Sequence, residues 1–343
     1  MSFRAWLSIV TFILLGVILF FARHELERAW ELLFQVNLWL LFLLIPAQIL
    51  LYYAGGEMIF SYLRDKGRMK AVSRAELGQV ALEGNFVNHV LPSGGVSGVS
   101  YLTWRLGHLG ISHGRATMAQ VVRYAMGFVS FSVLLVFALF MVTIDGNINR
   151  LIILVSALLI GGMSSTIIGA IFLFSSKRRT EVFGVWITKK LNGITRVVTF
   201  GKKRRIVKPK KVTGFMDDMH HDFLELRHDK KLLIKPFLWG ILYTILDAGL
   251  FLISFLALGE VVNPALILIA YGAASLAGFF VLTPGGAGAY EAIMVAFLAI
   301  AGLTQSVAIA GILLTRVILL LGTIIFGYIF YQRALIKYGK HKP

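Results

Sequence analysis

The stretch Val281-Leu-Thr-Pro-Gly-Gly-Ala-Gly-Ala-Tyr-Glu291 separates two apolar runs, residues 265–280 and 292–302. A transmembrane helix needs about 20 apolar residues, so each run is too short to cross a bilayer comfortably. Pro284 blocks helix continuation, while Gly285, Gly286 and Gly288 permit backbone angles that other residues avoid. A broken backbone survives in a bilayer only where protein or a watery cavity surrounds it. The stretch therefore predicts a re-entrant helical hairpin, with the ionisable Glu291 at a functional position.

The composition is typical of a polytopic membrane protein. The chain of 343 residues is 57% hydrophobic and 15% charged. Six long apolar segments predict transmembrane helices at 3–22, 38–63, 116–144, 151–174, 236–258 and 306–331. We expect the first segment to be a helix rather than a cleaved signal, because it has no small-residue cleavage site. The absence of cysteine excludes disulfides and thiolate metal sites. The expected fold is one all-α integral membrane domain over residues 1–343.

A second interrupted region, residues 76–109, resembles the first. Its sequence Leu91-Pro-Ser-Gly-Gly-Val-Ser-Gly98 is similar to Thr283-Pro-Gly-Gly-Ala-Gly288, so Pro92, Gly94 and Gly95 correspond to the motif at 284–286. Eighteen residues after each proline comes a glycine, and Ser112 or Thr304 then suits the N-cap of the next helix. The region predicts a second re-entrant hairpin.

Charged residues extend this correspondence beyond the hairpins. Each following helix contains one arginine, Arg123 or Arg316, and each preceding helix contains one acid, Glu57 or Asp247. Matches in this order indicate a duplicated unit, with repeats at about 37–144 and 235–333. Counting membrane crossings makes the repeats inverted, as in transporters whose substrate site lies near the midplane. An old duplication that serves packing alone is the alternative.

Basic residues predict the orientation. The segment 177–235 contains seventeen lysines and arginines, and those of 64–74 and of the tail lie on the same expected side. By the positive-inside rule this side is cytoplasmic, with both termini, in the cell membrane. Within the connector, about 176–235, Val182, Phe183, Trp186, Ile187 and Leu191 recur at helical spacing. We expect a helix at the interface that contacts anionic lipids, or otherwise a solvated connector. No nucleic-acid-binding fold is indicated.

Arg123 and Arg316 lie too deep in their helices to reach water easily. A charge at such a depth costs at least about 2.5–3.5 kcal/mol, so each should face a partner or an anionic ligand. Guanidinium groups bind phosphate with two parallel hydrogen bonds. The alternative is structural ion pairing, of Arg316 with Asp247 or Glu291 and of Arg123 with Glu57 or Glu83. Asn85, Asn88 and His89 share a helix face and would bind head-group hydroxyls or hold the broken backbone together.

Other motifs are absent or weak. Asp217, Asp218, His220, His221 and Asp222 form a run that we interpret as a solvated helix face rather than a metal site. No phosphate-cradling nucleotide loop, Ser/His/Asp triad or zinc-protease motif occurs. We therefore expect no enzyme activity, cofactor or metal.

The two hairpin motifs, with Asn88, Glu291 and Arg316, resemble the lysylphosphatidylglycerol synthase transmembrane family, also called the flippase-like domain family. The resemblance extends over nearly the whole chain and implies movement of a phospholipid or polyprenyl-phosphate-linked lipid between leaflets. The soluble synthase domain of some relatives is not expected here. In this scheme Arg123 and Arg316 would hold phosphate, and Glu57, Glu83, Asp247 and Glu291 would balance charge or take up protons. Two rival hypotheses are a non-transporting anchor for a glycosyltransferase or lipid-modifying enzyme, and a membrane transferase with Glu291 as base.

Overall fold

The structure, a computed structural model, describes residues 20, 23, 27, 30–32, 34, 36–69, 72–90, 96–144, 150–198, 209–280 and 288–339. In this part of the chain every regular element is a helix. The helices are α3 (Leu38–Phe42), α4 (Leu44–Asp65), α5 (Arg74–Val90), α6 (Val96–Gly107), α7 (His113–Ile144), α8 (Arg150–Phe174), α9 (Lys177–Val198), α10 (Pro209–His228), η1 (Lys230–Leu233), α11 (Ile234–Ala257), α12 (Pro264–Phe280), α13 (Ala289–Ile300) and α14 (Gln305–Tyr338).

Five helical segments are long and apolar enough to cross a membrane, namely Leu38–Asp65, His113–Ile144, Arg150–Phe174, Lys230–Ala257 and Gln305–Tyr338. Each coincides with one of the expected segments, which confirms a multi-pass membrane protein. The remaining expected span, 3–22, lies almost entirely outside the described residues. The long helices have apolar side chains on their outer faces, as Phe137, Phe140 and Ile168 illustrate. Such a surface suits lipid, because lipid tails solvate it and water does not.

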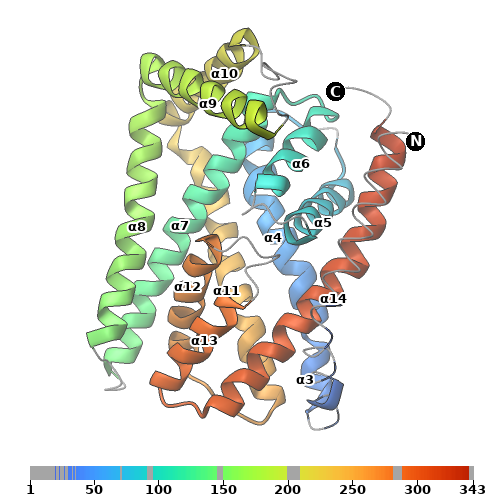
Figure 1. Ribbon diagram of the computed structural model, residues 1–343, viewed down its shortest axis with the longest axis vertical. Helices are drawn as coiled ribbons and strands as arrows, with labels where there is room; N and C mark the ends of the chain where they lie inside the picture. Colours follow the sequence, from blue (N-terminus) through green and yellow to red (C-terminus); the bar gives the residue numbers. More distant parts are fainter. Residues whose placement is uncertain are drawn as a thin grey trace.

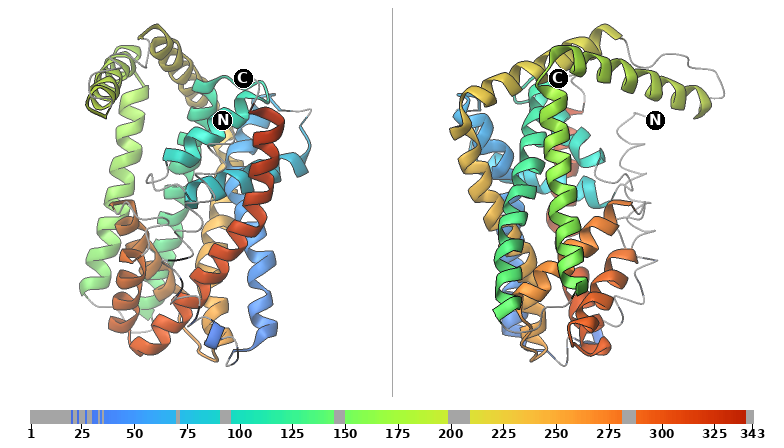
Figure 2. Two further views of the ribbon diagram at one scale, coloured as in Figure 1. Left: turned by 45° about the vertical axis from the view of Figure 1, so that its right-hand side comes forward. Right: turned by 90° about the vertical axis from the view of Figure 1, so that its left-hand side faces the viewer.

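Two pairs of shorter helices lie at opposite ends of the bundle (Figures 1 and 2). Helices α5 and α6 occupy the end near α9 and α10, whereas α12 and α13 occupy the other end. Members of each pair pack against one another. The turns between them, 91–95 and 281–287, lie outside the described residues. The same holds for six motif residues predicted at the site, Pro92, Gly94, Gly95, Pro284, Gly285 and Gly286.

Corresponding helices end in the same way. Gly110 after α6 and Gly302 after α13 have φ of 82° and 101°, which a side chain would disfavour. In both places the amide of the residue after the glycine donates to the carbonyl five positions earlier. Ile111 donates to the Leu106 carbonyl at 3.1 Å, and Leu303 donates to the Leu298 carbonyl at 3.0 Å. The expected cap positions, Ser112 and Thr304, directly precede α7 and α14. However, the Thr304 side chain forms no capping hydrogen bond.

The two sets of helices pack crosswise. Helix α4 packs against α11, α5 against α14, and α12 against α7. A buried polar contact ties α4 to α14, since Gln48 donates to the Leu319 carbonyl at 2.8 Å and Tyr52 bonds to Thr323. The hairpin of one set is therefore held by the last long helix of the other.

The described parts of the connector are helical. It contains α9 and α10, both lying across one end of the bundle at a steep angle to the long helices (Figure 1). The expected amphipathic helix is present as α9, with Val182, Val185 and Trp186 more than half exposed. In contrast, the apolar side of α10 packs against the bundle, where Met219 is buried.

The expectation of a solvated face on α10 is wrong for Asp222 and holds for Asp217, whose side chain is 44% exposed. Asp222 is fully buried and pairs with Lys66 at 2.7 Å, and Ser112 donates to Asp218 at 2.7 Å. The sequence run looked solvated because its basic partners come from distant parts of the chain.

Candidate functional site

The first part of the candidate site lies where α13 begins. Arg316 on α14 donates from Nε to Glu291 Oε1 at 2.7 Å, and both side chains are about three-quarters buried. The Glu291 carboxylate also accepts the Gly288 amide at 2.6 Å, one turn back along the chain. Gly288 has φ of 92° and directly precedes α13. Glu291 therefore caps its own helix and pairs with an arginine of another helix at once.

Tyrosines surround this pair. The Arg316 guanidinium lies over the Tyr290 ring, 4.5 Å from its centroid, and the Tyr271 ring meets Tyr290 edge-on. The Tyr271 hydroxyl donates to the carboxylate of Asp247 on α11. Of the two predicted partners of Arg316, Glu291 is the direct one, while Asp247 interacts with Arg316 over a longer distance. Sequence reasoning missed these tyrosines, although polar hydroxyls inside apolar runs were a usable signal.

The second part is a small cavity of about 40 Å³ between α4, α5, α6 and α7. Its polar lining consists of Asn85, Asn88, Gln120 and Arg123. The Asn88 carbonyl oxygen is buried without a hydrogen-bond partner among the described residues, whereas Asn85 donates to the Ala81 carbonyl at 2.9 Å. Gln120, which the sequence did not single out, donates to Thr103 at 2.9 Å. Asn85 thus supports its own helix, and Asn88 retains an unused acceptor.

Arg123 has no carboxylate partner within 4.0 Å among the described residues. The predicted pairing with Glu57 or Glu83 is therefore wrong. The Glu57 carboxylate accepts hydrogen bonds from both terminal nitrogens of Arg64, which lies two turns further along the same helix. Glu83 receives Arg105 Nε at 3.1 Å.

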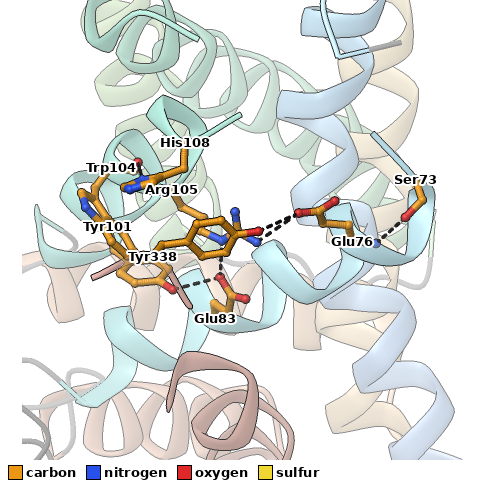
Figure 3. Close-up of polar contacts among 8 residues, drawn as sticks. All are labelled: Ser73, Glu76, Glu83, Tyr101, Trp104, Arg105, His108 and Tyr338. Atoms are coloured by element: carbon orange, nitrogen blue, oxygen red, sulfur yellow. Dashed lines mark hydrogen bonds and ion pairs between the residues drawn. The ribbon is translucent and has the colours of Figure 1, made fainter. Parts of the chain in front are cut away.

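The Glu83–Arg105 pair follows from the shape of the hairpin. Glu83 and Arg105 are each eleven residues from position 94, so antiparallel helices bring them to the same level. Tyr101 also donates to Glu83 at 2.9 Å (Figure 3). This symmetry about the turn was a signal that sequence reasoning could have used. It excludes Glu83 as a counter-charge for Arg123.

Tyr243 on α11 connects the two parts. A Cβ built on Gly55 would lie 3.1 Å from the Tyr243 ring and 3.3 Å from Arg123 Nη2. The glycine thus lets both side chains approach the backbone of α4. Tyr243 interacts electrostatically with Arg123 and Asp247, and Asp247 interacts with Arg316. Polar groups therefore extend from Arg123 through Tyr243 and Asp247 toward Arg316, and we call this set of four residues the polar track.

The inner end of α5 also approaches this track. His89 bonds through Nδ1 to the Asn85 carbonyl at 2.8 Å, and Arg316 acts electrostatically on its imidazole. Helices from before and after the connector thus contribute to one region: Asn85 and Asn88 from α5, Arg123 from α7, Asp247 from α11, Glu291 from α13 and Arg316 from α14.

A group of possible metal ligands lies elsewhere, on α10. Side-chain atoms of His221, Asp222 and Glu225 come within 4.8 Å of one another. Lys66 already occupies this group, since its Nζ lies 2.7 Å from Asp222 and 2.6 Å from Glu225. Partial burial acts to raise the pKa of Glu225, but the hydrogen bond and charge of Lys66 outweigh it and hold the pKa below its usual range. The cluster acts as an ion-paired clamp between α10 and the end of α4.

Comparison with known proteins identifies the family. The family described as lysylphosphatidylglycerol synthase TM region matches residues 5–327, which is nearly the whole chain. The chain belongs to this family. No curated protein and no solved structure matches it.

Proposed function

We propose that this member of the lysylphosphatidylglycerol synthase transmembrane family is a flippase-like transporter, not an enzyme. It would move a phospholipid or polyprenyl-phosphate-linked lipid between leaflets, with the head group between the two hairpins. The observation that carries the proposal is the polar track of Arg123, Tyr243, Asp247 and Arg316 inside an apolar bundle. Arg316 is paired with Glu291, whereas Arg123 has no carboxylate partner among the described residues.

The arrangement of helices supports an inverted repeat. In this proposal α5–α6 and α12–α13 are re-entrant hairpins that enter from opposite membrane faces, consistent with their positions at opposite ends of the bundle (Figure 1). The crosswise packing of α5 on α14 and of α12 on α7 is what a two-fold axis in the membrane plane would produce. In such transporters the substrate site lies between the repeats, where the polar track lies here.

The chemistry of the track suits a phosphate group. No described carboxylate neutralises Arg123, so its guanidinium can donate to an anion. The unsatisfied Asn88 oxygen in the same cavity would accept a head-group hydroxyl or ammonium proton. The acids at the far end of the track, Asp247 and Glu291, would compete with the lipid for Arg316 and release it when they are protonated.

A liposome assay tests the proposal. The protein is reconstituted with a fluorescent phospholipid, and a membrane-impermeant quencher reports the fraction of label in the outer leaflet. We expect Arg123→Gln and Arg316→Gln each to slow translocation at least tenfold, since a charge-assisted hydrogen bond is worth about 1.5–3 kcal/mol. The matched control is Arg227→Gln, which removes an exposed positive charge on α10. Equal rates for wild type and Arg123→Gln would refute the assigned role.

The orientation is part of the proposal. Helices α9 and α10 and the hairpin α5–α6 would face the cytoplasm, together with both termini, in the cell membrane. The excess of lysine and arginine in the connector supports this. Exposed Val182, Val185 and Trp186 on α9, next to Lys189 and Lys190, would lie in the head-group region and contact anionic lipids.

The same helix favours a second candidate function. Figure 2 shows α9 extending sideways from the end of α8, which would also suit docking of a partner such as a glycosyltransferase or lipid-modifying enzyme. In that case the chain would be an anchor without transport activity. Co-purification of such an enzyme, lost on deletion of residues 202–211, together with no translocation in liposomes, would favour the anchor.

A further inference from the structure

A second, larger cavity of about 270 Å³ lies between the start of α5 and the last turns of α14. It lies at the opposite end of α5 from the site around Asn88. Its charged and hydroxyl lining comes from α5, α6, α14 and the residue before α5: Ser73, Glu76, Glu83, Arg105, Arg333, Lys337 and Tyr338.

Arg105 is buried beside this cavity with its hydrogen bonding incomplete. Its Nε donates to Glu83 at 3.1 Å and its Nη2 to Glu76 at 3.3 Å, while Tyr338 covers the guanidinium at 4.2 Å. Only 3% of the side chain is exposed, and Nη1 has no acceptor in the part of the chain that the structure describes. Figure 3 shows the acceptors gathered on one side of the guanidinium, with the remaining nitrogen unpaired. An unsatisfied buried donor on a charged group is destabilising, so Nη1 favours an acceptor that enters from the cavity.

The charges around the cavity favour an anion. Glu76 and Glu83 both form ion pairs with Arg105. The Tyr338 hydroxyl also donates to Glu76 at 3.4 Å, and the Tyr101 hydroxyl donates to Glu83. The other two cations of the lining, Arg333 and Lys337, have no carboxylate within 4.0 Å among the described residues. Three positive charges thus face two negative ones. The cavity lining therefore has a net positive charge, and it includes Arg105, whose Nη1 has no described acceptor.

The surroundings indicate the size and source of the anion. The cavity of about 270 Å³ lies near the lower end of the roughly 300–1,000 Å³ typical of small-molecule sites, so it has room for a phosphate group. On α14 Arg333 lies on the same exposed stripe as Ile329 and Ile336, which are 50% and 72% exposed. If α14 crosses the membrane, this stripe faces lipid, and a head group at its end can reach the cavity.

We propose that the cavity between α5, α6 and α14 binds a phosphate group, supplied by a lipid head group or by a free phosphate compound. Arg105 Nη1 and the side chains of Arg333 and Lys337 donate to its oxygens, and the Ser73 hydroxyl lies in the same lining. The site is separate from the polar track, so it does not depend on transport.

Calorimetric titration of the full-length protein in detergent at constant ionic strength tests the proposal. The two ligands titrated are inorganic phosphate and water-soluble dihexanoyl phosphatidylglycerol. We expect saturable binding of at least one, weakened about tenfold or more in R333Q/K337Q because two charge-assisted contacts are lost. The control R227Q/K230Q removes two exposed positive charges elsewhere and should bind within about twofold of wild type.

The outcomes separate the possible sources. Binding of inorganic phosphate alone indicates a soluble phosphate compound, whereas tighter binding of the phosphatidylglycerol indicates a lipid head group. The variant R333K/K337R keeps both positive charges and should bind with the wild-type affinity. That result would show that the weaker binding of R333Q/K337Q comes from the lost charge and not from misfolding. The proposal is overturned if neither ligand saturates, if R333Q/K337Q binds like wild type, or if R227Q/K230Q loses as much affinity.

Discussion

The Arg316–Glu291 pair allows a quantitative test of how the second hairpin is held. Glu291→Gln keeps an oxygen that can accept the Gly288 amide but removes the charge that faces Arg316. The side chains are 25% and 29% exposed, so the effect should lie between that of an exposed ion pair, about 0–1 kcal/mol, and that of breaking a buried pair, about 3–5 kcal/mol. We expect a loss of about 1–3 kcal/mol.

Glu291→Ala separates the capping contribution from the charge. This variant removes the acceptor for the Gly288 amide as well as the charge, and loss of an N-cap contributes about a further 0.5–2 kcal/mol. The order of stability should therefore be wild type, then Glu291→Gln, then Glu291→Ala. Reversible unfolding in mixed micelles with increasing dodecyl sulfate measures the three free energies.

A double-mutant cycle tests the pairing itself. If the two residues interact directly, the loss in Glu291→Gln/Arg316→Gln is smaller than the sum of the single losses by about 1–2 kcal/mol. Strict additivity would refute the ion pair. Equal stability of Glu291→Gln and Glu291→Ala would refute the cap.

Three further predictions concern other parts of the bundle. Lys66→Met leaves the buried Asp222 charge without its closest partner, which should cost about 3–5 kcal/mol and increase proteolysis of α10 relative to the exposed control Lys230→Met. Because the folded pKa of Glu225 is lowered, its pairing with Lys66 stabilises α10 above the unfolded pKa of about 4.3 and is lost as the pH falls through the folded value. Hydrogen exchange of α10 should therefore accelerate selectively at acidic pH, and an unchanged profile would contradict the clamp. Gly240→Ala on α11 places a Cβ 2.5 Å from Ser130 Oγ and should lose about 1–3 kcal/mol, whereas Gly249→Ala on the same helix meets nothing within 4 Å and should gain up to about 1 kcal/mol.

The elements that depend on residues close together in the sequence were predictable. The five described spans follow from runs of apolar residues, because a bilayer accepts a backbone only when its hydrogen bonds are satisfied within the segment. The ends of α6 and α13 follow from Gly110 and Gly302, since a positive φ is a local requirement. Amphipathic α9 follows from its helical spacing of apolar residues. The family was also recognisable from the hairpin motifs, and the match over residues 5–327 confirms it.

The partners of the charged residues were not predictable in the same way. The sequence suggested Glu57 or Glu83 for Arg123, but those acids pair with Arg64 and Arg105 and leave Arg123 facing a cavity and Tyr243. Likewise the acidic run on α10 looked solvated, yet Asp222 is buried against Lys66.

Hydropathy and turn chemistry therefore determined which segments cross the membrane and where they break, because both depend on neighbours along the chain. Ion pairing depends on which helices pack side by side and how they are rotated. The Lys66–Asp222 pair, for example, joins the end of α4 to α10, and only the tertiary structure decides that these two helices meet.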